Sequence, residues 1–468
     1  MYYVIIHCTI LCIASHLICY RLFGTVVQSL CIFIHSSSAC AMLDIKFIIE
    51  NKDIVAAAIK NKHTEQVDID RIVELYEKRK ALRQELDSLN AAKRIAAQER
   101  NIEEGQRIKQ ESARVNETLP SVEKELVTLV SKIPNLPSAD TPVGDDESAN
   151  RVMRTWGTPK QFDFQPKPHW ELGAELDVID MEKAALVSGS RFVYLKGDLV
   201  RMQFALINFA FDTLGDVDIL ANIAKEAGVD VPITPFIPIL PPTFMRTAVM
   251  NRMARLHPMD ERYVFEKDDM VLVGSAEHTI GPLHMDEIID EKDLPKRYVG
   301  YGTAFRREAG AAGKDTRGIL RLHQFDKIEL ETFVVPERSF QEQDFIVAIQ
   351  QHLMRKLELP HQVVLKCTYD QGAPNCRGID IETWIPTQNT YRETHTSDLM
   401  TSYQSRRLNT RVRRSDGKIE HVHMNDATVF AMSRTLLAIM ENHQERDGSI
   451  TVPSVLRDYM KKERIGTA

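Results

Sequence analysis

Between residues 70 and 133, apolar side chains recur at alternating spacings of three and four, which is the seam pattern of a coiled coil. Arg79 takes one seam position, and a polar stretch at residues 98–110, with Gly105 as a break, separates two apolar runs. We therefore predict an antiparallel helical hairpin whose second helix is bent at Pro120. The seam residues are Ile72, Leu75, Leu82, Leu86 and Leu89, then Ile108, Val115, Leu119, Val122, Leu126, Leu129 and Ile133.

Basic residues follow the first helix of this hairpin and its tip. Such a row can contact nucleic-acid phosphates, but acidic residues such as Glu85 and Glu103 dilute it. A spacer or a dimerisation coil would look similar, so the pattern leaves both interpretations open. The basic residues are Lys78, Arg79, Lys80, Arg83, Lys93, Arg94, Arg100, Arg107 and Lys109.

After residue 133 the pattern changes. Three prolines and an acidic run in residues 133–150 indicate a linker. Strand pairs joined by loops, with helices before and after, then favour an antiparallel α+β domain. No G-x-G-x-x-G or Walker loop occurs in the sequence, which argues against a Rossmann or P-loop nucleotide site. Helices are expected at 169–189, 199–215 and 428–444, and strands at 191–195, 263–275, 298–308, 319–335, 361–368 and 378–386.

Composition narrows the class of protein. The 468 residues exceed one typical domain, and 43% hydrophobic with 27% charged residues is ordinary for a globular protein. The formal charge of −7 means that any nucleic-acid contact must come from local basic patches. Of the seven cysteines, Cys367 and Cys376 alone follow residue 41, too few for a disulfide framework. We therefore expect a reducing, cytoplasmic location.

The segment 305–330, FRREAGAAGKDTRGILRLHQFDKIEL, carries the densest candidate chemistry. If it forms two strands joined by a small basic loop, Arg306 and Glu308 share one face of the first strand. The same alternation groups His323, Phe325, Lys327 and Glu329 on the second strand and turns Ile328 and Leu330 toward a core. A guanidinium can hold a phosphate, a ring can stack on a base, and a carboxylate can hold an amine. The alternative is a charged hairpin with cross-strand ion pairs.

Further motifs surround this segment in a fixed order. They are HWELG and VSGSRFVYLKG (169–197), GSAEHTIGPLHMDEII (274–289), PTQNTYRETHTSDLMTSYQSRRL (386–408) and SRTLLAIMENHQERDGSITVPSVLRDYM (433–460). With 305–330 as class II motif 2, the chain from Met42 to Ala468 resembles the bacterial type of the seryl-tRNA synthetase family. The resemblance implies an α+β fold, with a tRNA-binding coiled-coil arm at 42–140, a linker at 141–152, and a class II antiparallel-sheet catalytic domain at 153–468.

The resemblance also implies a reaction and its residues. The family activates L-serine with ATP to seryl-adenylate and transfers serine to the 3′ end of tRNA(Ser), and of tRNA(Sec), releasing AMP and diphosphate. Catalytic roles are implied for Arg306, Glu308 and Arg434, and Glu393 with Thr396 would hold Mg²⁺ with ATP. The implied ATP-binding residues are Arg306, Arg307, Glu308, Phe325, Glu393, Thr394, His395, Thr396 and Arg434. The implied serine-binding residues are Ser275, Ala276, Glu277, Arg306, Glu329 and Thr428.

Some features of the resemblance concern assembly and departures from the family pattern. The family is a homodimer, which makes PFIPILPPTFM (235–245) the candidate motif 1 interface, and the loop 310–318 is expected to move to meet ATP and the tRNA acceptor end. Asp426 stands where the family has Asn, so the serine contacts near Asp398 and Asp426 are expected to differ. Two rival functions are a ligase that loads a carrier other than tRNA and a coiled-coil regulator with an inactive synthetase domain.

The first 41 residues have no counterpart in the family. Their apolar length permits a membrane span, and Ala39-Cys40-Ala41 resembles a signal-peptide cleavage site, although the basic region that usually precedes one is missing. A third interpretation is that translation starts at Met42 and the leader is an upstream reading frame. We favour the third because the chain from Met42 onward matches the whole pattern of a cytosolic enzyme.

Overall fold

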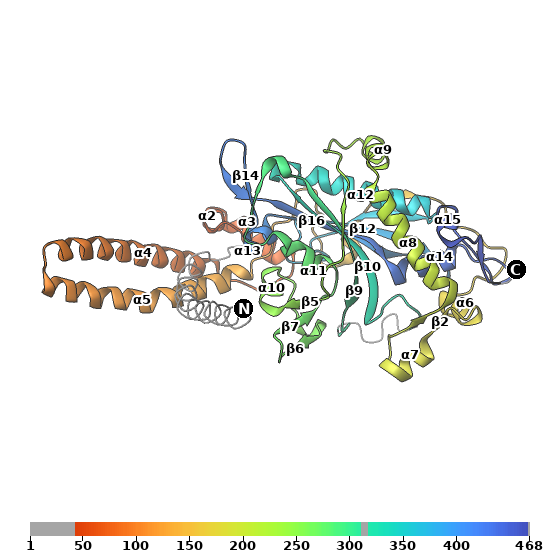
Figure 1. Ribbon diagram of the computed structural model, residues 1–468, viewed down its shortest axis with the longest axis horizontal. Coiled ribbons are helices and arrows are strands. Elements are labelled where there is room, and N and C mark those ends of the chain that lie inside the picture. The colour runs from red at the N-terminus through yellow and green to blue at the C-terminus, as the bar shows by residue number, and fades with distance from the viewer. Residues whose placement is uncertain (1–42, 310–316, 467–468) are drawn as a thin grey trace, which may run out of the picture. The chain divides into compact units, whose positions relative to one another are not determined.

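The structure is a computed structural model that describes residues 43–309 and 317–466 (Figure 1). The predictions on the leader of residues 1–41 and on most of the loop 310–318 therefore lie outside the described residues. Contacts divide the described chain into two compact units, which are treated separately below: residues 75–128 form one, and residues 43–74 together with 129–466 form the other.

Two long helices, α4 (Ile69–Gln98) and α5 (Ile102–Ser131), carry the predicted hairpin. Their seam is apolar as expected, and Leu89, Ala96, Ile108 and Val115 pack together in it. The predicted break at Gly105 is wrong, because the turn lies at residues 99–101 and Asn101 caps α5 through the backbone N–H of Glu104 at 3.1 Å. Helix α5 runs on through Pro120.

Residues on either side of the hairpin belong with the catalytic unit. Helices α2 (Ile45–Glu50) and α3 (Lys52–Asn61) bury Ile48 and Val55, and the Lys62 ammonium donates to the carbonyl oxygens of Gly372 and Asn375. The expected linker is also held in place, since the Asn135 amide donates to the carbonyl of Met400 at 2.8 Å. The compact units thus have other boundaries than the predicted 42–140 and 141–152.

An eight-stranded sheet forms the centre of the catalytic unit. All its strand pairs are antiparallel except β4 with β9, which confirms the predicted antiparallel α+β class. In spatial order the strands are β1 (Arg151–Trp156), β11 (His361–Leu365), β12 (Arg377–Ile385), β13 (Thr390–Thr401), β16 (His423–Ala431), β10 (Gln324–Val334), β9 (Lys296–Phe305) and β4 (Ile237–Ile239).

One face of this sheet is covered by helices. Ile328 and Leu330 of β10 and Phe430 of β16 are fully buried there, in a core shared with α8 (Gly197–Gly215), α12 (Ser339–Lys356) and α14 (Met432–Asn442). The alternation predicted for β10 is therefore confirmed, because Lys327 and Glu329 point to the opposite face. The other helices of the unit are α6 (His169–Glu175), α7 (Met181–Ser188), α9 (Val217–Ala227), α10 (Thr247–Arg252), α11 (Glu277–Ile280), α13 (Tyr403–Leu408) and α15 (Arg457–Met460).

Several predicted elements differ from the structure. The helix expected at 169–189 is two helices, α6 and α7. Strand β2 (Ile179–Asp180) separates them and pairs with β3 (Tyr194–Leu195), which follows α7. The helix expected from residue 428 begins at Met432, and both β13 and β16 were missed. The remaining strands are β5 (Phe244–Arg246), β6 (Val264–Phe265), β7 (Met270–Leu272), β8 (Ile288–Asp290), β14 (Arg411–Arg413), β15 (Ile419–His421), β17 (Ile450–Thr451) and β18 (Arg464–Ile465).

Cys367 and Cys376 are buried free thiols. Within residues 43–309 and 317–466, every helix is too short or too polar to cross a lipid bilayer.

The centre of the sheet is opened by two β-bulges. In β13, Glu393 pairs with Glu382 and His395 with Ile381, so Thr394 is an extra residue. In β16, Val429 is extra in the same way, between the partners of Ile328 and Glu329. An extra residue bends its strand, and the pairing of β13 with β16 stops at Ser397 opposite Ala427.

A glutamine from α12 closes the gap that the two strands leave. The Gln350 amide nitrogen donates to the carbonyl oxygen of Thr396 at 2.8 Å and to that of Thr428 at 2.7 Å. These carbonyls are the first that the separated strands leave without a ladder partner. Gln350 is completely buried, so water does not replace it.

We predict that Gln350→Leu lowers the free energy of unfolding by about 1–3 kcal/mol, because it leaves two buried carbonyls without a donor. Since residues 396 and 428 border the same gap, ligand affinity at the open end of the sheet should fall as well. Chemical denaturation and ligand titration measure the two effects. Gln351→Leu is the control: it removes a neighbouring buried amide bonded to Arg154 and should leave ligand affinity unchanged.

Candidate active site

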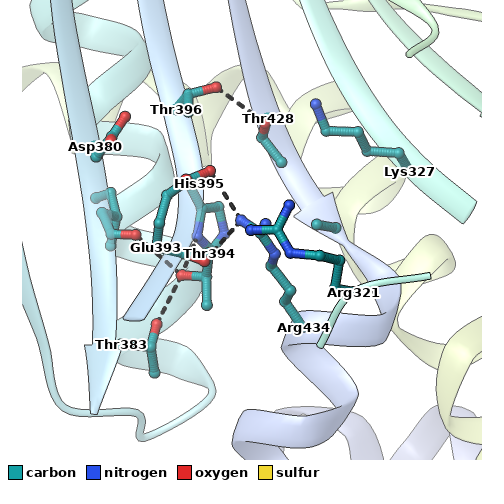
Figure 2. A network of polar contacts seen from close by, with 12 residues as sticks. Arg321, Lys327, Asp380, Thr383, Glu393, Thr394, His395, Thr396, Thr428 and Arg434 are labelled. Carbon is teal, nitrogen blue, oxygen red and sulfur yellow. Dashed lines mark hydrogen bonds and ion pairs between the residues drawn. The ribbon is translucent and has the colours of Figure 1, made fainter. Parts of the chain in front are cut away.

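A pocket opens on the face of the sheet that the helices leave uncovered, at the point where β13 and β16 separate (Figure 2). It encloses about 560 Å³, a volume that includes space open to solvent. Residues from β10, β13, β16, the start of α14 and both ends of the 310–318 loop meet in it. Its lining is Arg306, Glu308, Leu320, Arg321, Leu322, Phe325, Lys327, Glu393, Thr394, Thr396, Thr428, Ala431, Ser433 and Arg434.

Arg306 and Phe325 form one end of the pocket. The guanidinium carbon of Arg306 lies 5.4 Å from the Phe325 ring centroid, and its Nε donates to the Gly274 carbonyl at 2.9 Å. These contacts fix the guanidinium while its other nitrogens face the pocket. A planar cation stacked on a ring can bind an anionic group beside an aromatic base.

Glu308 reaches the pocket by a route other than the predicted one. Strand β9 ends at Phe305, so Arg306 and Glu308 do not share a strand face. Instead Glu308 has a φ of 53°, a left-handed turn that brings its carboxylate back to the pocket, where Arg321 donates to it at 2.5 Å. Arg321 was missed, because nothing in its local pattern separates it from the basic loop beside it.

The returning end of the loop is anchored by a buried histidine. His169 accepts from the backbone N–H of Ile319 at 3.0 Å, and its other ring nitrogen donates to Glu441 of α14 at 2.8 Å. Gly318 has a φ of 76°, and a Cβ there would fall 2.0 Å from His169. The motif HWELG therefore serves the site indirectly, by fixing where the loop re-enters the sheet.

The bulge in β13 determines which of its residues face the pocket. Positions three apart lie on opposite faces of a regular strand. With Thr394 as the extra residue, Glu393 and Thr396 both line the pocket, while His395 turns into the core and packs 6.0 Å from Phe430. The bulge in β16 acts in the same way and brings Thr428 and Ala431 to the pocket together.

Glu393 and Arg434 form an ion pair at the pocket wall. Arg434 donates to the Glu393 carboxylate and to its carbonyl oxygen, each at 2.9 Å. Burial acts to raise the pKa of Glu393, but the charges of Arg434, Lys366 and Arg306 outweigh it and lower the pKa to about 2. Glu393 is therefore an anion throughout the physiological range and available to a cation.

The deeper end of the site is a cluster of buried polar side chains. The Lys327 ammonium donates to the Ser275 hydroxyl at 3.2 Å and forms an ion pair with Glu329. Glu329 is paired across the strands with Thr428, and Glu277 opens the short helix α11 beside Ser275. Four of the residues predicted to bind serine thus lie together, along with Lys327, which was not predicted to bind: Ser275, Glu277, Glu329 and Thr428.

Buried charge shapes this cluster. Burial raises the pKa of Glu329 to about 7. Burial also opposes ionisation of Glu277, but His278, Lys327 and Arg255 outweigh it and lower the pKa of Glu277 to about 2. Glu277 is therefore ionised at neutral pH, and its carboxylate can pair with the ammonium group of a small ligand.

Behind the cluster a row of carboxylates crosses three neighbouring strands. Asp398 pairs with Asp426, and Asp426 pairs with Glu331, so all three share the face of the pocket. Like charges placed directly opposite one another repel. Burial raises the pKa of both Asp426 and Glu331 well above the ordinary range, and the Arg255 guanidinium bonds Asp426 at 2.8 Å. Protonation of Asp426 and Glu331, together with the Arg255 guanidinium, relieves the repulsion within the row.

Two residues predicted for ATP lie away from the pocket. Arg307 is exposed and stacks 5.8 Å from the Tyr263 ring. His395 is fully buried, and burial lowers its pKa to about 3. Lys327 and Ser433 line the pocket although neither was predicted to bind. Lys327 could have been found, since it is a cation within a strand face that otherwise carries Phe325 and Glu329.

Two family profiles match the sequence. The profile of the seryl-tRNA synthetase N-terminal domain matches residues 42–137, and that of the tRNA synthetase class II core domain (G, H, P, S and T) matches residues 263–443. The serine–tRNA ligase of Symbiobacterium thermophilum is 39% identical over 441 residues, covering 91% of this chain and 100% of the relative.

The chain belongs to the seryl-tRNA synthetase family. Solved structures agree with this assignment. Seryl-tRNA synthetase from Pyrococcus horikoshii, complexed with ATP, superimposes with a TM-score of 0.80 at 32% identity over 91% of this chain and 100% of that one. The cytoplasmic serine–tRNA ligase of Naegleria fowleri, in complex with AMP, gives 0.79 at 29% identity over 90% and 98%.

For this synthetase we predict that Arg255→Met lowers the free energy of unfolding by about 3 kcal/mol, because it removes the guanidinium that bonds the buried Asp426 side chain at 2.8 Å. The double variant Arg255→Met with Asp426→Asn should recover most of that loss, since an amide needs no counter-charge. A double-mutant cycle by chemical denaturation measures the coupling. The prediction would be contradicted if Arg255→Met lowered the free energy of unfolding by the same amount with Asp426 present as with asparagine at that position.

Proposed function

We propose that this synthetase activates L-serine with ATP and transfers it to the 3′ end of tRNA(Ser), with tRNA(Sec) as a second acceptor. The observation that carries the proposal is the meeting, on one sheet face, of a cation–ring pair suited to a nucleotide and a buried acidic cluster suited to a small ammonium. The ATP and AMP complexes of the two solved relatives support the nucleotide half.

The first step needs positioning more than protein chemistry. The adenine would lie against Phe325 near Glu308, and Arg306 would hold the α-phosphate. The serine ammonium would lie between Glu277 and Glu329, with its hydroxyl at Thr428. An oxygen of the serine carboxylate then attacks the α-phosphorus in line, and the bond to diphosphate breaks. Fixed charges such as Arg306 stabilise the negative charge that develops.

A divalent cation fits beside the terminal phosphates. No cluster of three metal-ligating side chains occurs among residues 43–309 and 317–466, so protein groups alone would not hold it. Mg²⁺ usually binds through one or two carboxylates with phosphate oxygens and water completing its shell. Glu393, ionised and at the pocket wall, and Thr396 would be its protein ligands. The ion would neutralise phosphate charge, and Arg434 would exchange Glu393 for the leaving diphosphate.

The second step needs the tRNA acceptor end at the pocket and the tRNA body on the arm. The terminal ribose hydroxyl attacks the seryl carbonyl, and AMP leaves. In the arm, Arg107 and Arg114 form ion pairs with glutamates. By contrast, Lys93, Arg94, Arg100 and Lys109 have no ion-pair partner within the described arm and surround the turn between α4 and α5. They form the basic tip that we assign to tRNA phosphates.

A homodimer is part of the proposal. The segment 235–245 contributes the edge strand β4, in which Ile237 is 54% exposed. Leu240, which follows β4, and Phe244, in β5 of a separate sheet, are 77% and 47% exposed. Exposed apolar side chains on a segment that includes an open sheet edge favour a protein partner. A cytoplasmic location stays a prediction from the sequence.

We predict serine-dependent ATP–diphosphate exchange, and a loss on the order of 100-fold or more in Arg306→Ala, because removing one preorganised charged donor has that effect. Exchange assays across the twenty amino acids measure both. The geometry predicts a smaller loss for Arg307→Ala, which lies outside the pocket. Exchange at the wild-type rate in Arg306→Ala would remove Arg306 from the role given to it.

We further predict that replacing Lys93, Arg94, Arg100 and Lys109 by Gln raises the KM for tRNA by on the order of tenfold and flattens its salt dependence, because phosphate contacts are lost. Serine-dependent ATP–diphosphate exchange, which needs no tRNA, should stay unchanged. Arg107→Gln with Arg114→Gln is the control, since both arginines are already paired with glutamates. An equal rise in the KM for tRNA in both sets of variants would argue for a purely structural arm. A loss of serine-dependent ATP–diphosphate exchange without tRNA would argue for the same conclusion.

A further inference from the structure

Lys327 occupies the place where the proposed function puts the ammonium of serine. Its own ammonium donates to Ser275, is ion-paired with Glu329, and contributes to the field that keeps Glu277 ionised. These are the side chains expected to bind the substrate. The Lys327 side chain lies within the cluster and not on the protein surface, since 8% of its surface is exposed to solvent.

Two ammonium groups do not fit this cluster at once. Each would need the Glu329 carboxylate as its hydrogen-bonding partner, and like charges at contact distance repel strongly in a buried site. The strand backbone of β10 fixes the root of Lys327, but its four-carbon stem can swing. Serine binding must therefore turn the Lys327 ammonium away from Glu329.

Strand order determines where the displaced ammonium goes. Along one face of β10 come Phe325, Lys327 and Glu329, so Lys327 is rooted between the ring at the nucleotide end and the carboxylate at the serine end. It already lines the same pocket as Arg306. The anions that meet between those two ends are the α-phosphate of ATP and the carboxylate of serine.

We propose that Lys327 is a displaceable counter-cation: it neutralises the serine subsite of the empty enzyme and, displaced by the serine ammonium, carries its charge to the α-phosphate during attack. The proposal rests on the proposed function of the pocket and adds a catalytic residue to it. Lys327 keeps its three protons throughout. The new bond joins the serine carboxylate oxygen to phosphorus, the phosphorus–oxygen bond to diphosphate breaks, and diphosphate leaves with the electron pair.

This arrangement separates binding from catalysis. Lys327→Met keeps the length of the side chain but removes the competing ammonium, so the KM for serine should fall by on the order of tenfold. The same variant lacks a charged donor at the reacting phosphorus, so kcat should fall by on the order of 100-fold. A residue that merely supported the fold would raise KM and lower kcat together.

Lys327→Arg gives the opposite test and also serves if the Met variant does not fold. Its wider planar fork keeps the charge and remains bonded between carboxylates. It should raise the KM for serine by on the order of tenfold while retaining more of kcat than the Met variant does. The matched control is Lys167→Met, which breaks an exposed ion pair with Glu175 at 2.7 Å and should change neither constant.

The experiment is serine-dependent ATP–diphosphate exchange with the full chain, with serine and ATP varied separately, and thermal melts to confirm folding. A lower serine KM with a lower kcat in Lys327→Met, together with a raised serine KM in Lys327→Arg, supports the proposal. An unchanged kcat in the Met variant, or an unchanged serine KM in the Arg variant, overturns it. A wild-type enzyme without serine-dependent exchange would instead overturn the proposed function itself.

Discussion

The site depends on placing many carboxylates on one buried sheet face without their mutual repulsion unfolding it. Glu277, Glu329, Glu331, Asp398 and Asp426 lie on neighbouring strands or beside them, and all are buried. Isolated buried charge is unfavourable by several kcal/mol, so each carboxylate needs a cation, a donor or a proton. Arg255 and Lys327 supply two cations. Under the proposed function, the ionised Glu277 carboxylate would pair with a ligand that brings an ammonium of its own.

The backbone supplies the opening that such a ligand needs. A regular sheet would pair β13 with β16 along their whole length and would turn Glu393 and Thr396 to opposite faces. The extra residues Thr394 and Val429 end that pairing and bring both side chains to one face. Gln350 then satisfies the carbonyls that the separation exposes. The pocket thus lies at an interruption of the β-ladder, where Gln350 supplies the missing hydrogen bonds. The position of this interruption fixes the distance between the nucleotide end and the acidic cluster.

The sequence allowed the core of the fold to be predicted better than the floor of the site. Heptads revealed the hairpin, and alternation in β10 separated Glu329 from Ile328, because each pattern reports a boundary between water and apolar packing. Strands β13 and β16 were missed since their pocket faces carry Thr, Asp and Asn where a core would carry apolar residues. Glu308 was assigned to the pocket for the wrong reason, and His395 was misplaced, because a left-handed turn and a bulge leave no mark in a binary pattern.

Asp426 shows how a motif can change while its geometry survives. The family pattern has an amide at this position, which accepts hydrogen bonds without adding charge. A carboxylate there lies directly between Asp398 and Glu331, and it requires a cation within reach. Arg255 meets that requirement from the end of α10, outside the strands, so no strand has to move. Thr428 and Glu329, one step along the same strands, keep their cross-strand pairing. The departure therefore places an ionisable carboxyl group behind the proposed serine subsite, while the cross-strand pairing of Glu329 with Thr428 is retained.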